Sequence, residues 1–298
     1  MKIEKKHQFE GHEGAIYALA YNSLTNKVFS GGFDNIVVEW SIENPKDFAA
    51  IAKLPSKTIS LKFIPDFNWL LTGQSNGDVH ILDLNKKEEI HILRVHTDMI
   101  FSICYHEDSG CFYIGSGDGF ISVWHISSMS LLRKVNISSK KIRALTFIEG
   151  HLYIGCGDGS VKVVNVTSFE VIDVLEDHMI DFSVNCIANA TDNRILTGSR
   201  DGHLNVYSLI EGVRTLVNRI PAHNYAIYDI AFSNDRRYFA TASRDKSIKI
   251  WDAQTFDFIK KIDYVNSKGH TASVNAVLWL NEKLVTTGDD RKIIVWDI

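Results

Sequence analysis

Histidine, a hydroxyl residue and aspartate occur together at similar spacings in three parts of this sequence. In that combination a histidine can take the proton of a serine or threonine hydroxyl while the aspartate orients the imidazole, which is the chemistry of a nucleophilic triad. The sets are His12, Ser30 and Asp34; His223, Thr241 and Asp245; and His270, Thr286 and Asp290. An active site is normally built once, whereas a folding device is built in every repeat. The recurrence therefore favours a structural hydrogen-bond network over catalysis.

The repetition extends along the whole chain in steps of 40 to 45 residues. Each copy ends a strand-like run on an anchor residue: Trp40, Leu82, Trp124, Val164, Tyr207, Trp251 and Trp296. Six residues before each anchor stands a short acidic or amide side chain: Asp34, Asn76, Asp118, Asp158, Asp201, Asp245 and Asp290. Such side chains favour tight turns because they hydrogen-bond nearby backbone N–H groups. Seven copies at this period indicate a propeller or a helical array.

Within each copy the pattern is that of antiparallel strands. In residues 222–253, short runs of alternating apolar and polar residues are separated by turn-forming Ser, Asn and Asp, which predicts half-buried strands joined by tight hairpins. A histidine lies 20 to 23 residues before the turn residue in five copies: His12, His96, His178, His223 and His270 (20 in the last). The second and fourth copies lack both this histidine and a large aromatic anchor, which suggests that the two serve the same interaction.

Two kinds of dipeptide link the sequence to a known family. Gly11-His12 and Gly269-His270, with Trp251-Asp252 and Trp296-Asp297, resemble the GH and WD dipeptides of WD40 repeats, over essentially all 298 residues. The resemblance implies an all-β, seven-bladed β-propeller like that of G-protein β subunits, each blade being a four-stranded antiparallel sheet. We therefore expect one propeller domain, residues 1–298.

The ends of the chain predict how the ring closes. The chain stops at Ile298, where the third strand of the seventh copy should finish, and Lys2 to Phe9 alternate like an outer strand. In this family the N-terminal segment supplies the missing strand. We expect residues 2–9 to pair into the seventh blade and so remove an open sheet edge.

The resemblance also implies a buried network of Trp, Ser/Thr, His and Asp in each blade. Its expected members are His12, Ser30, Asp34, Trp40, His96, Asp118, Trp124, His178, Thr197, Asp201, His223, Thr241, Asp245, Trp251, His270, Thr286, Asp290 and Trp296. These residues are expected to hold the blades together.

For function, the resemblance implies binding of proteins or peptides on the face that carries the Asp turns and the loops before each first strand. Aligning the copies places aromatic and arginine side chains there: Tyr17, Phe33, Phe101, Arg143, Arg200, Tyr228 and Arg244. Tyr and Arg are enriched among interface hot spots. Lys140 and Lys141 extend the arginines into a basic sector suited to an acidic or phosphorylated peptide. The alternative is that these residues only cap the channel rim.

The fifth copy has a longer loop on this face. His178 and Ile187 are 9 residues apart, whereas the matching pairs in the four other histidine-containing copies are 7 apart. The loop includes the apolar residues Met179, Ile180 and Phe182. Apolar side chains in a lengthened surface loop suggest a partner contact, for which we select Met179 and Phe182. They could instead fold back onto the neighbouring blade.

Composition narrows the class of protein. With 45% hydrophobic residues and a net charge of -4, the chain is expected to be globular, and neither a nucleic-acid nor a membrane partner is expected. The four cysteines form no CxxC pair, and no histidine spacing indicates a metal. We expect reduced thiols, with a Cys104–Cys111 disulfide left open. No signal peptide or membrane span is apparent, so a cytoplasmic location is expected.

The sequence thus predicts a non-enzymatic scaffold without cofactors or metal, monomeric by itself or within a hetero-complex, that binds a partner protein or peptide. Two alternatives stay open. One is a propeller enzyme with a single active site at the channel mouth, using Asp289 or the arginines. The other is an RNA-binding subunit of a larger particle, which the acidic balance disfavours.

Overall fold

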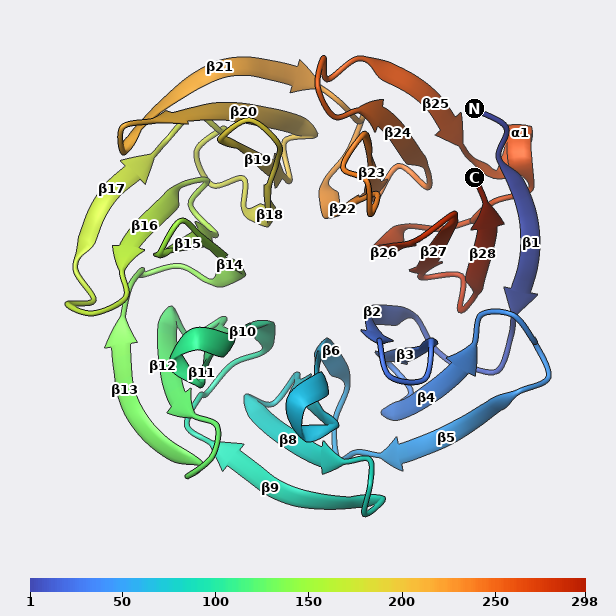
Figure 1. The fold of residues 1–298 in the computed structure, drawn as a ribbon, viewed down its shortest axis with the longest axis horizontal. Coiled ribbons are helices and arrows are strands. Elements are labelled where there is room, and N and C mark those ends of the chain that lie inside the picture. The colour runs from blue at the N-terminus through green and yellow to red at the C-terminus, as the bar shows by residue number, and fades with distance from the viewer.

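Short strands joined by tight turns follow one another along the chain and form seven antiparallel sheets around a central axis (Figure 1). The computed structural model describes residues 1–298. The seven-bladed propeller that the sequence predicts is therefore confirmed. In six blades the strands lie in chain order, from the innermost strand at the channel to the outermost strand at the rim.

The first four blades span residues 16 to 175. Blade one consists of β2 (Ile16–Asn22), β3 (Lys27–Gly32), β4 (Ile36–Ser41) and β5 (Phe48–Lys53). Blade two consists of β6 (Thr58–Ile64), β7 (Trp69–Gln74), β8 (Asp78–Asp83) and β9 (Glu88–Arg94). Blade three consists of β10 (Ile100–His106), β11 (Cys111–Ser116), β12 (Phe120–His125) and β13 (Ser130–Asn136). Blade four consists of β14 (Ile142–Ile148), β15 (His151–Cys156), β16 (Val161–Asn165) and β17 (Val171–Leu175).

The remaining blades complete the ring. Blade five consists of β18 (Val184–Asn189), β19 (Arg194–Ser199), β20 (His203–Ile210) and β21 (Val213–Pro221). Blade six consists of β22 (Ile227–Phe232), β23 (Tyr238–Ser243), β24 (Ile248–Asp252) and β25 (Phe258–Ile262). Blade seven consists of β26 (Val274–Leu280), β27 (Lys283–Gly288), β28 (Ile293–Asp297) and β1 (Glu4–Phe9). The short helical turns are η1 (Pro65–Phe67), η2 (Glu107–Ser109) and α1 (Tyr264–Ser267).

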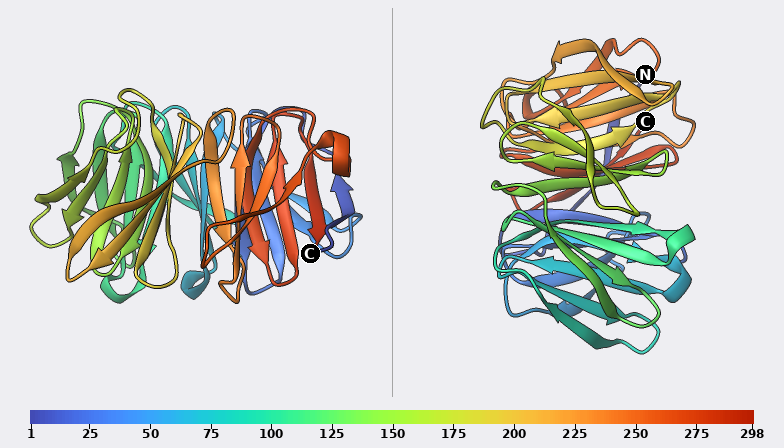
Figure 2. Two further views of the ribbon diagram at one scale, coloured as in Figure 1. Left: turned by 90° about the horizontal axis from the view of Figure 1, so that it is seen from above. Right: turned by 90° about the vertical axis from the view of Figure 1, so that its left-hand side faces the viewer.

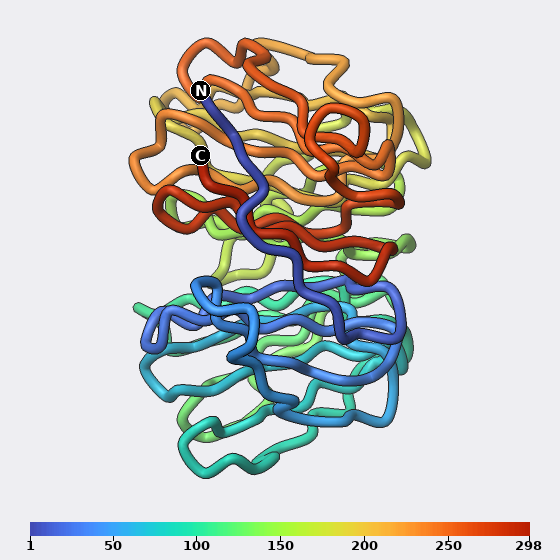
Figure 3. Tube along the Cα trace, turned by 90° about the vertical axis from the view of Figure 1, so that its right-hand side faces the viewer, coloured from blue at the N-terminus to red at the C-terminus, as the bar shows by residue number.

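The N-terminal strand closes the ring, as predicted. β1 pairs antiparallel with β28, from Glu4 opposite Asp297 to Phe9 opposite Ile293, and Figure 3 shows the two ends of the chain side by side. The strand begins at Glu4, two residues later than the predicted start. Its flanking Ile3 and its last residue Phe9 are buried, so β1 contributes apolar packing as well as backbone hydrogen bonds.

The core lies between neighbouring blades. Each of the seven apolar clusters combines side chains from adjacent sheets: Trp40 of blade one, for example, packs in one cluster with Val295 of blade seven and with Phe9 of β1. Burying a large apolar side chain contributes about 1.5–3 kcal/mol. Each blade is therefore stabilised mainly by its neighbours, and a ring is the arrangement in which every blade has two.

The loops on one face of the ring contain tight turns, and we call this face the top face. It carries the Asp turns and the loops that lead into the innermost strands, and Figure 2 shows the ring edge-on with its strands running between the two faces. In each turn the acidic or amide side chain accepts a hydrogen bond from the backbone N–H two residues on, as in Asp34 to Ile36 at 3.2 Å. These bonds fix the positions of the neighbouring side chains.

Other sequence expectations concern cysteines and helices. All four cysteines are free thiols. Across the hairpin of blade three, Cys104 lies opposite Tyr113, and Cys111 lies opposite His106. No helix has the length and apolar character needed to cross a membrane. The short helix α1 precedes the innermost strand of blade seven and is capped by Asp263, whose carboxylate accepts from the Asn266 N–H at 2.8 Å.

Candidate functional site

In blade one the triad-like residues form a chain of hydrogen bonds that links three elements. The indole N–H of Trp40 donates to Ser30 Oγ at 2.7 Å. Ser30 Oγ lies 2.7 Å from His12 Nε2, and His12 Nδ1 lies 2.8 Å from an Asp34 carboxylate oxygen. Ser30 has no solvent-exposed surface. Its hydroxyl is therefore out of reach of a substrate, although the order of groups is that of a hydrolase triad.

The same chain of hydrogen bonds occurs in blades six and seven, with threonine in place of serine. In blade six the Trp251 indole donates to Thr241 at 3.0 Å, Thr241 lies 2.8 Å from His223, and His223 lies 2.9 Å from Asp245. In blade seven the corresponding members are Trp296, Thr286, His270 and Asp290. In blade five, His178 joins Thr197 to Asp201, and Tyr207 occupies the anchor position.

Blade three forms its network with a residue that the sequence alignment did not select. His96 bonds to Asp118, but its other ring nitrogen lies 2.8 Å from Ser122 Oγ on β12, and the Trp124 indole donates to the same oxygen at 3.0 Å. In this blade the hydroxyl that bonds to the histidine comes from the third strand, whereas in blade one it comes from the second. A serine two residues before the tryptophan was the available signal.

Blades two and four, which lack the histidine, use shorter networks. In blade two the Gln74 side-chain amide donates to Thr58 Oγ1 at 3.2 Å and to Thr72 Oγ1 at 3.3 Å. In blade four the Asp158 carboxylate accepts from the backbone N–H and the hydroxyl of Ser160, at 3.0 and 2.7 Å. The turn geometry is thus retained where the histidine link is absent.

Burial and hydrogen bonding shift the pKa values of histidines and aspartates in these networks. It lowers the pKa of His96 and of His223, against the opposing effect of their aspartate partners. Burial alone would raise the pKa of Asp201 and of Asp245, but hydrogen bonds from the histidine and the backbone outweigh it and hold both well below the usual range. At neutral pH the networks of blades three and six therefore pair a neutral imidazole with a carboxylate.

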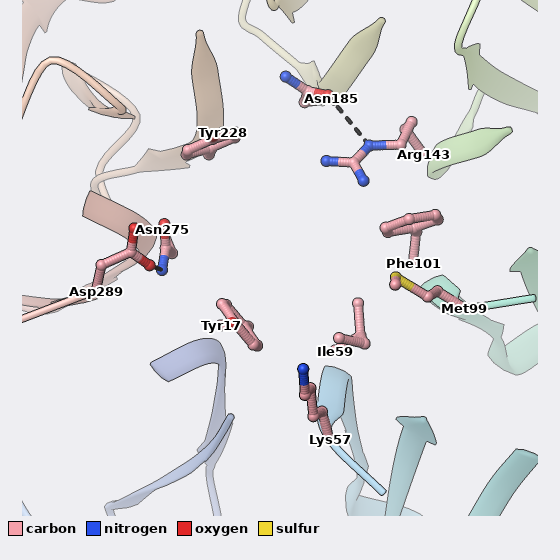
Figure 4. Close-up of a pocket in the computed structure, with 10 residues that line it drawn as sticks. All are labelled: Tyr17, Lys57, Ile59, Met99, Phe101, Arg143, Asn185, Tyr228, Asn275 and Asp289. Carbon is pink, nitrogen blue, oxygen red and sulfur yellow. Dashed lines mark hydrogen bonds between the residues drawn. The ribbon is translucent and has the colours of Figure 1, made fainter. Parts of the chain in front are cut away.

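A pocket opens where the channel reaches the top face (Figure 4). Its volume is about 430 Å³. It brings together four residues predicted to bind a partner, namely Tyr17, Phe101, Arg143 and Tyr228. The equivalent residues of the other blades and three loop residues complete its lining: Ile59, Asn185, Asn275, Lys57, Met99 and Asp289. We call it the channel-mouth pocket.

Lys57 and Met99, which were not predicted from the sequence, directly precede the innermost strands β6 and β10, one residue outside the alternating pattern of each strand. Asp289, the acid that an enzyme at this place could use, accepts a hydrogen bond from the Asn275 amide at 2.8 Å. Burial, together with the charge of Asp289, raises the pKa of Tyr17. The lining of the pocket therefore combines apolar and aromatic side chains with polar and charged ones.

Besides Lys57, the channel-mouth pocket contains one further cation, Arg143. Its Nε donates to Asn185 Oδ1 at 3.2 Å, and the guanidinium carbon lies 4.0 Å from the centre of the Phe101 ring, a cation–π geometry. No carboxylate lies within ion-pair distance of it, and burial lowers its pKa. Figure 4 shows its terminal nitrogens directed toward the middle of the pocket.

A second hollow of about 500 Å³ adjoins the first on the top face. Its five cationic side chains are Lys140, Lys141, Arg143, Arg200 and Arg244, which is the basic sector predicted from the sequence. We call it the basic pocket. Lys140 pairs with Asp181 at 3.1 Å and Lys141 with Asp98 at 3.4 Å. Arg200 and Arg244 are exposed and have no acidic partner.

Three predicted contact residues lie outside both pockets. Phe33 is 50% exposed, with the Lys57 ammonium 4.0 Å from its ring centre. Met179 is 49% exposed, and Phe182 is half-buried beneath the Arg200 guanidinium. Asp181 and Ser183 of the same loop line the basic pocket. The lengthened loop of blade five therefore borders the basic pocket without filling it.

The two pockets can bind a ligand through their shape and their charge. No cluster of three or more His, Cys, Asp or Glu side chains is placed to hold a metal ion. The charged side chains that line the basic pocket are five cations and one acid, and the cations can pair with carboxylate or phosphate oxygens.

Five segments of the chain match the protein family described as "WD domain, G-beta repeat": residues 3–41, 87–125, 169–208, 214–252 and 263–297. Together they span well over half of the chain. The chain belongs to the WD40 repeat family. The unmatched parts of this WD40 chain include most of blades two and four, the blades without the histidine and the aromatic anchor.

Several WD40 proteins are similar to this chain along most of its length. It is 25% identical over 301 residues to Protein tipD of Dictyostelium discoideum, covering 98% of this chain and 48% of that protein. It is 26% identical over 245 residues to Target of rapamycin complex subunit LST8-1 of Arabidopsis thaliana, covering 78% of each. It is 24% identical over 285 residues to the Ribosome biogenesis protein WDR12 homolog of Drosophila virilis, covering 91% and 59%. The chain thus spans about half the length of Protein tipD.

Proposed function

We propose that this chain is a non-enzymatic scaffold that binds a partner protein or peptide on its top face. The observation that carries the proposal is the meeting of aromatic side chains and unpaired arginines in two adjoining pockets, on the face where the family resemblance implies binding. Membership of the WD40 family supports it. So does the similarity to a protein whose name makes it a subunit of a complex.

The chemistry of the basic pocket indicates which partner it suits. Five cations face one acid in its lining, and arginine forks bind carboxylate or phosphate oxygens through two parallel hydrogen bonds. An acidic or phosphorylated segment of the partner would neutralise them. We propose a cytoplasmic protein that is monomeric by itself or within a hetero-complex; the four free thiols fit a reducing compartment.

The absence of catalysis is part of the proposal. The triad-like residues recur in five blades, and in blade one the hydroxyl is completely buried. Such groups fit a device that fixes the fold. The cations of the top face fit binding, since arginine and tyrosine contribute most to interfaces when a partner excludes water from them.

A pull-down from cell extract tests the face. The double variant Tyr228→Ala, Arg244→Ala should lose partners that the wild type captures, while its melting temperature stays unchanged. The control is Arg291→Gln, which removes an exposed cation from the turn of blade seven on the same face, outside both pockets. An identical set of captured proteins from the double variant and the wild type would contradict the choice of face.

A further inference from the structure

The channel-mouth pocket and the basic pocket are joined. They share Arg143, Asn185 and Tyr228 as lining residues, so the second hollow begins where the first ends. The shared wall lies on blades four, five and six, whose innermost strands begin beside these residues. A group bound at Arg143 is therefore within reach of both pockets.

We propose that the two pockets form one recognition site for a short linear segment of the partner, with a tyrosine or tryptophan in the channel mouth and acidic groups next to it on Arg143, Arg200 and Arg244. This inference rests on the proposed function and adds the chemistry and order of the segment. Its ligand is a peptide, and the anion is a carboxylate or a phosphate.

The channel-mouth pocket determines the aromatic residue. Tyr17, Phe101 and Tyr228 present rings around it, and aromatic pairs gain stability beyond their buried area. The opposite wall carries the Asp289 carboxylate, already oriented by Asn275. A tyrosine hydroxyl or an indole N–H could donate a second hydrogen bond to this carboxylate, whereas phenylalanine or leucine would offer it no donor. The pocket volume of about 430 Å³ is that of a site for a small group.

Arg143 determines where the anion lies. Its Nε is occupied by Asn185 and one face of its guanidinium covers Phe101, so only its terminal nitrogens are free, and they point into the pocket. A partly buried charge without a counter-ion is costly, and an anionic ligand removes that cost. The first acidic group of the segment is therefore expected immediately beside the aromatic residue.

Arg200 and Arg244 extend the anion site onto the next two blades. Both stand directly before the turn aspartate, in blades five and six, and neither pairs with an acidic side chain. The two lysines of the basic pocket already have acidic partners, Asp181 and Asp98. The three arginines thus form an arc of guanidinium groups without acidic partners, which suits two or more successive acidic groups.

Fluorescence anisotropy with synthetic peptides on the full chain tests the inference. The parent probe is fluorescein-Gly-Ser-Gly-Trp-Glu-Glu-Gly-Ser-amide. Three further probes replace Trp by Gly, both Glu by Gln, or both Glu by phosphoserine. Removing either feature from the peptide should weaken binding by about tenfold or more, as expected for losing charged hydrogen bonds or an aromatic anchor. The phosphoserine probe shows which anion the arginines prefer.

Variants of the protein assign each half of the peptide to its pocket. With Phe101→Ala the Trp and Gly probes should bind alike, whereas the Glu and Gln probes should still differ. With Arg200→Gln, Arg244→Gln the Trp and Gly probes should still differ, whereas the difference between the Glu and Gln probes should shrink to the part that Arg143 contributes. Arg143→Gln should weaken the parent probe, and Arg143→Lys should restore only part of the affinity because it keeps the charge without the fork. Arg291→Gln serves as the control and should bind as wild type does.

Three results would overturn the inference. They are failure of the parent probe to bind, equal binding of the Trp and Gly probes to wild type, and tighter Arg143-dependent binding of a short oligouridylate. If the probe fails while the pull-down still shows loss of partners from the Tyr228→Ala, Arg244→Ala variant, the proposed face stands and only the motif is wrong. Circular dichroism of each variant verifies that it is folded.

Discussion

Replacing Asp245 by alanine should cost more free energy of unfolding than the same replacement of Asp158. The two aspartates occupy the same turn position in blades six and four and accept matching bonds from the serine two residues on, with N–H to O distances of 3.1 and 3.0 Å. Only Asp245 also accepts from a histidine, at 2.9 Å. The difference between the variants therefore isolates the histidine link.

The magnitude follows from what each variant leaves unpaired. Asp245→Ala leaves the Nδ1–H of His223, whose side chain has no exposed surface, with only the Ser247 hydroxyl at 3.5 Å, and a buried donor without a well-placed partner costs about 1–3 kcal/mol. The Asn224 N–H, 3.3 Å from the same carboxylate, belongs to an exposed residue that water can solvate. We expect Asp245→Ala to exceed Asp158→Ala by about 1–3 kcal/mol, or by roughly 2–12 °C in melting temperature.

Urea unfolding followed by tryptophan fluorescence measures the difference, and a double-mutant cycle with His223→Ala verifies its source. On the His223→Ala background, Asp245→Ala should cost no more than Asp158→Ala does in wild type. Equal losses from the two single variants would refute the structural role of the network. So would loss of partner binding by folded Asp245→Ala at unchanged stability.

Phe9→Ala should lower the free energy of unfolding by about 3–5 kcal/mol. The reason is that the aromatic ring of Phe9 packs 5.5 Å from that of Trp40, where blades seven and one meet and close the propeller. A loss below about 1 kcal/mol in urea titration would contradict a closing role for β1. Stability should fall as pH drops below about 6.5, since the lowered pKa of His96 and of His223 lets the unfolded chain bind protons first. Melting temperatures should show a shallower fall for His223→Gln, and parallel curves would argue against it. Burial raises the pKa of Asp229 to about 7, so its contribution is present below about pH 4 and is lost as the pH rises through 7. The melting temperature of Asp229→Asn should therefore gain on wild type between pH 5 and about pH 8, whereas a constant gap would refute the shift.

The sequence was sufficient to predict the fold because each repeat contains the residue types that turns and strands require. Six aspartates and Asn76, each six residues before an anchor, predicted the seven turns, and the alternation of residues 2–9 predicted the closing strand. The hydroxyl of blade three was missed because Ser122 reaches the histidine from β12 instead of β11. A hydrogen-bond network constrains where an oxygen lies in space, and two different strands can supply it.

The site was predictable in part. Tyr17, Phe101, Arg143 and Tyr228 share one position in the repeat, and ring symmetry brings equal positions together at the channel mouth. That Arg143 has no acidic partner could not be predicted, since this depends on which side chains the neighbouring blades place around it. Nor did the repeat show that Lys140 and Lys141 would be engaged by acids while Arg200 and Arg244 stay free.

The pairing of β1 with β28 also has a consequence during synthesis. Phe9 leaves the ribosome long before its partner Ile293, which lies in the last strand of blade seven. Until then β1 has no strand to pair with, although Phe9 can already pack against Trp40 of blade one, and joining such distant segments makes formation of the last contact slow. We expect nascent chains stalled before β28 to need chaperones and to be the form of this protein most prone to aggregate.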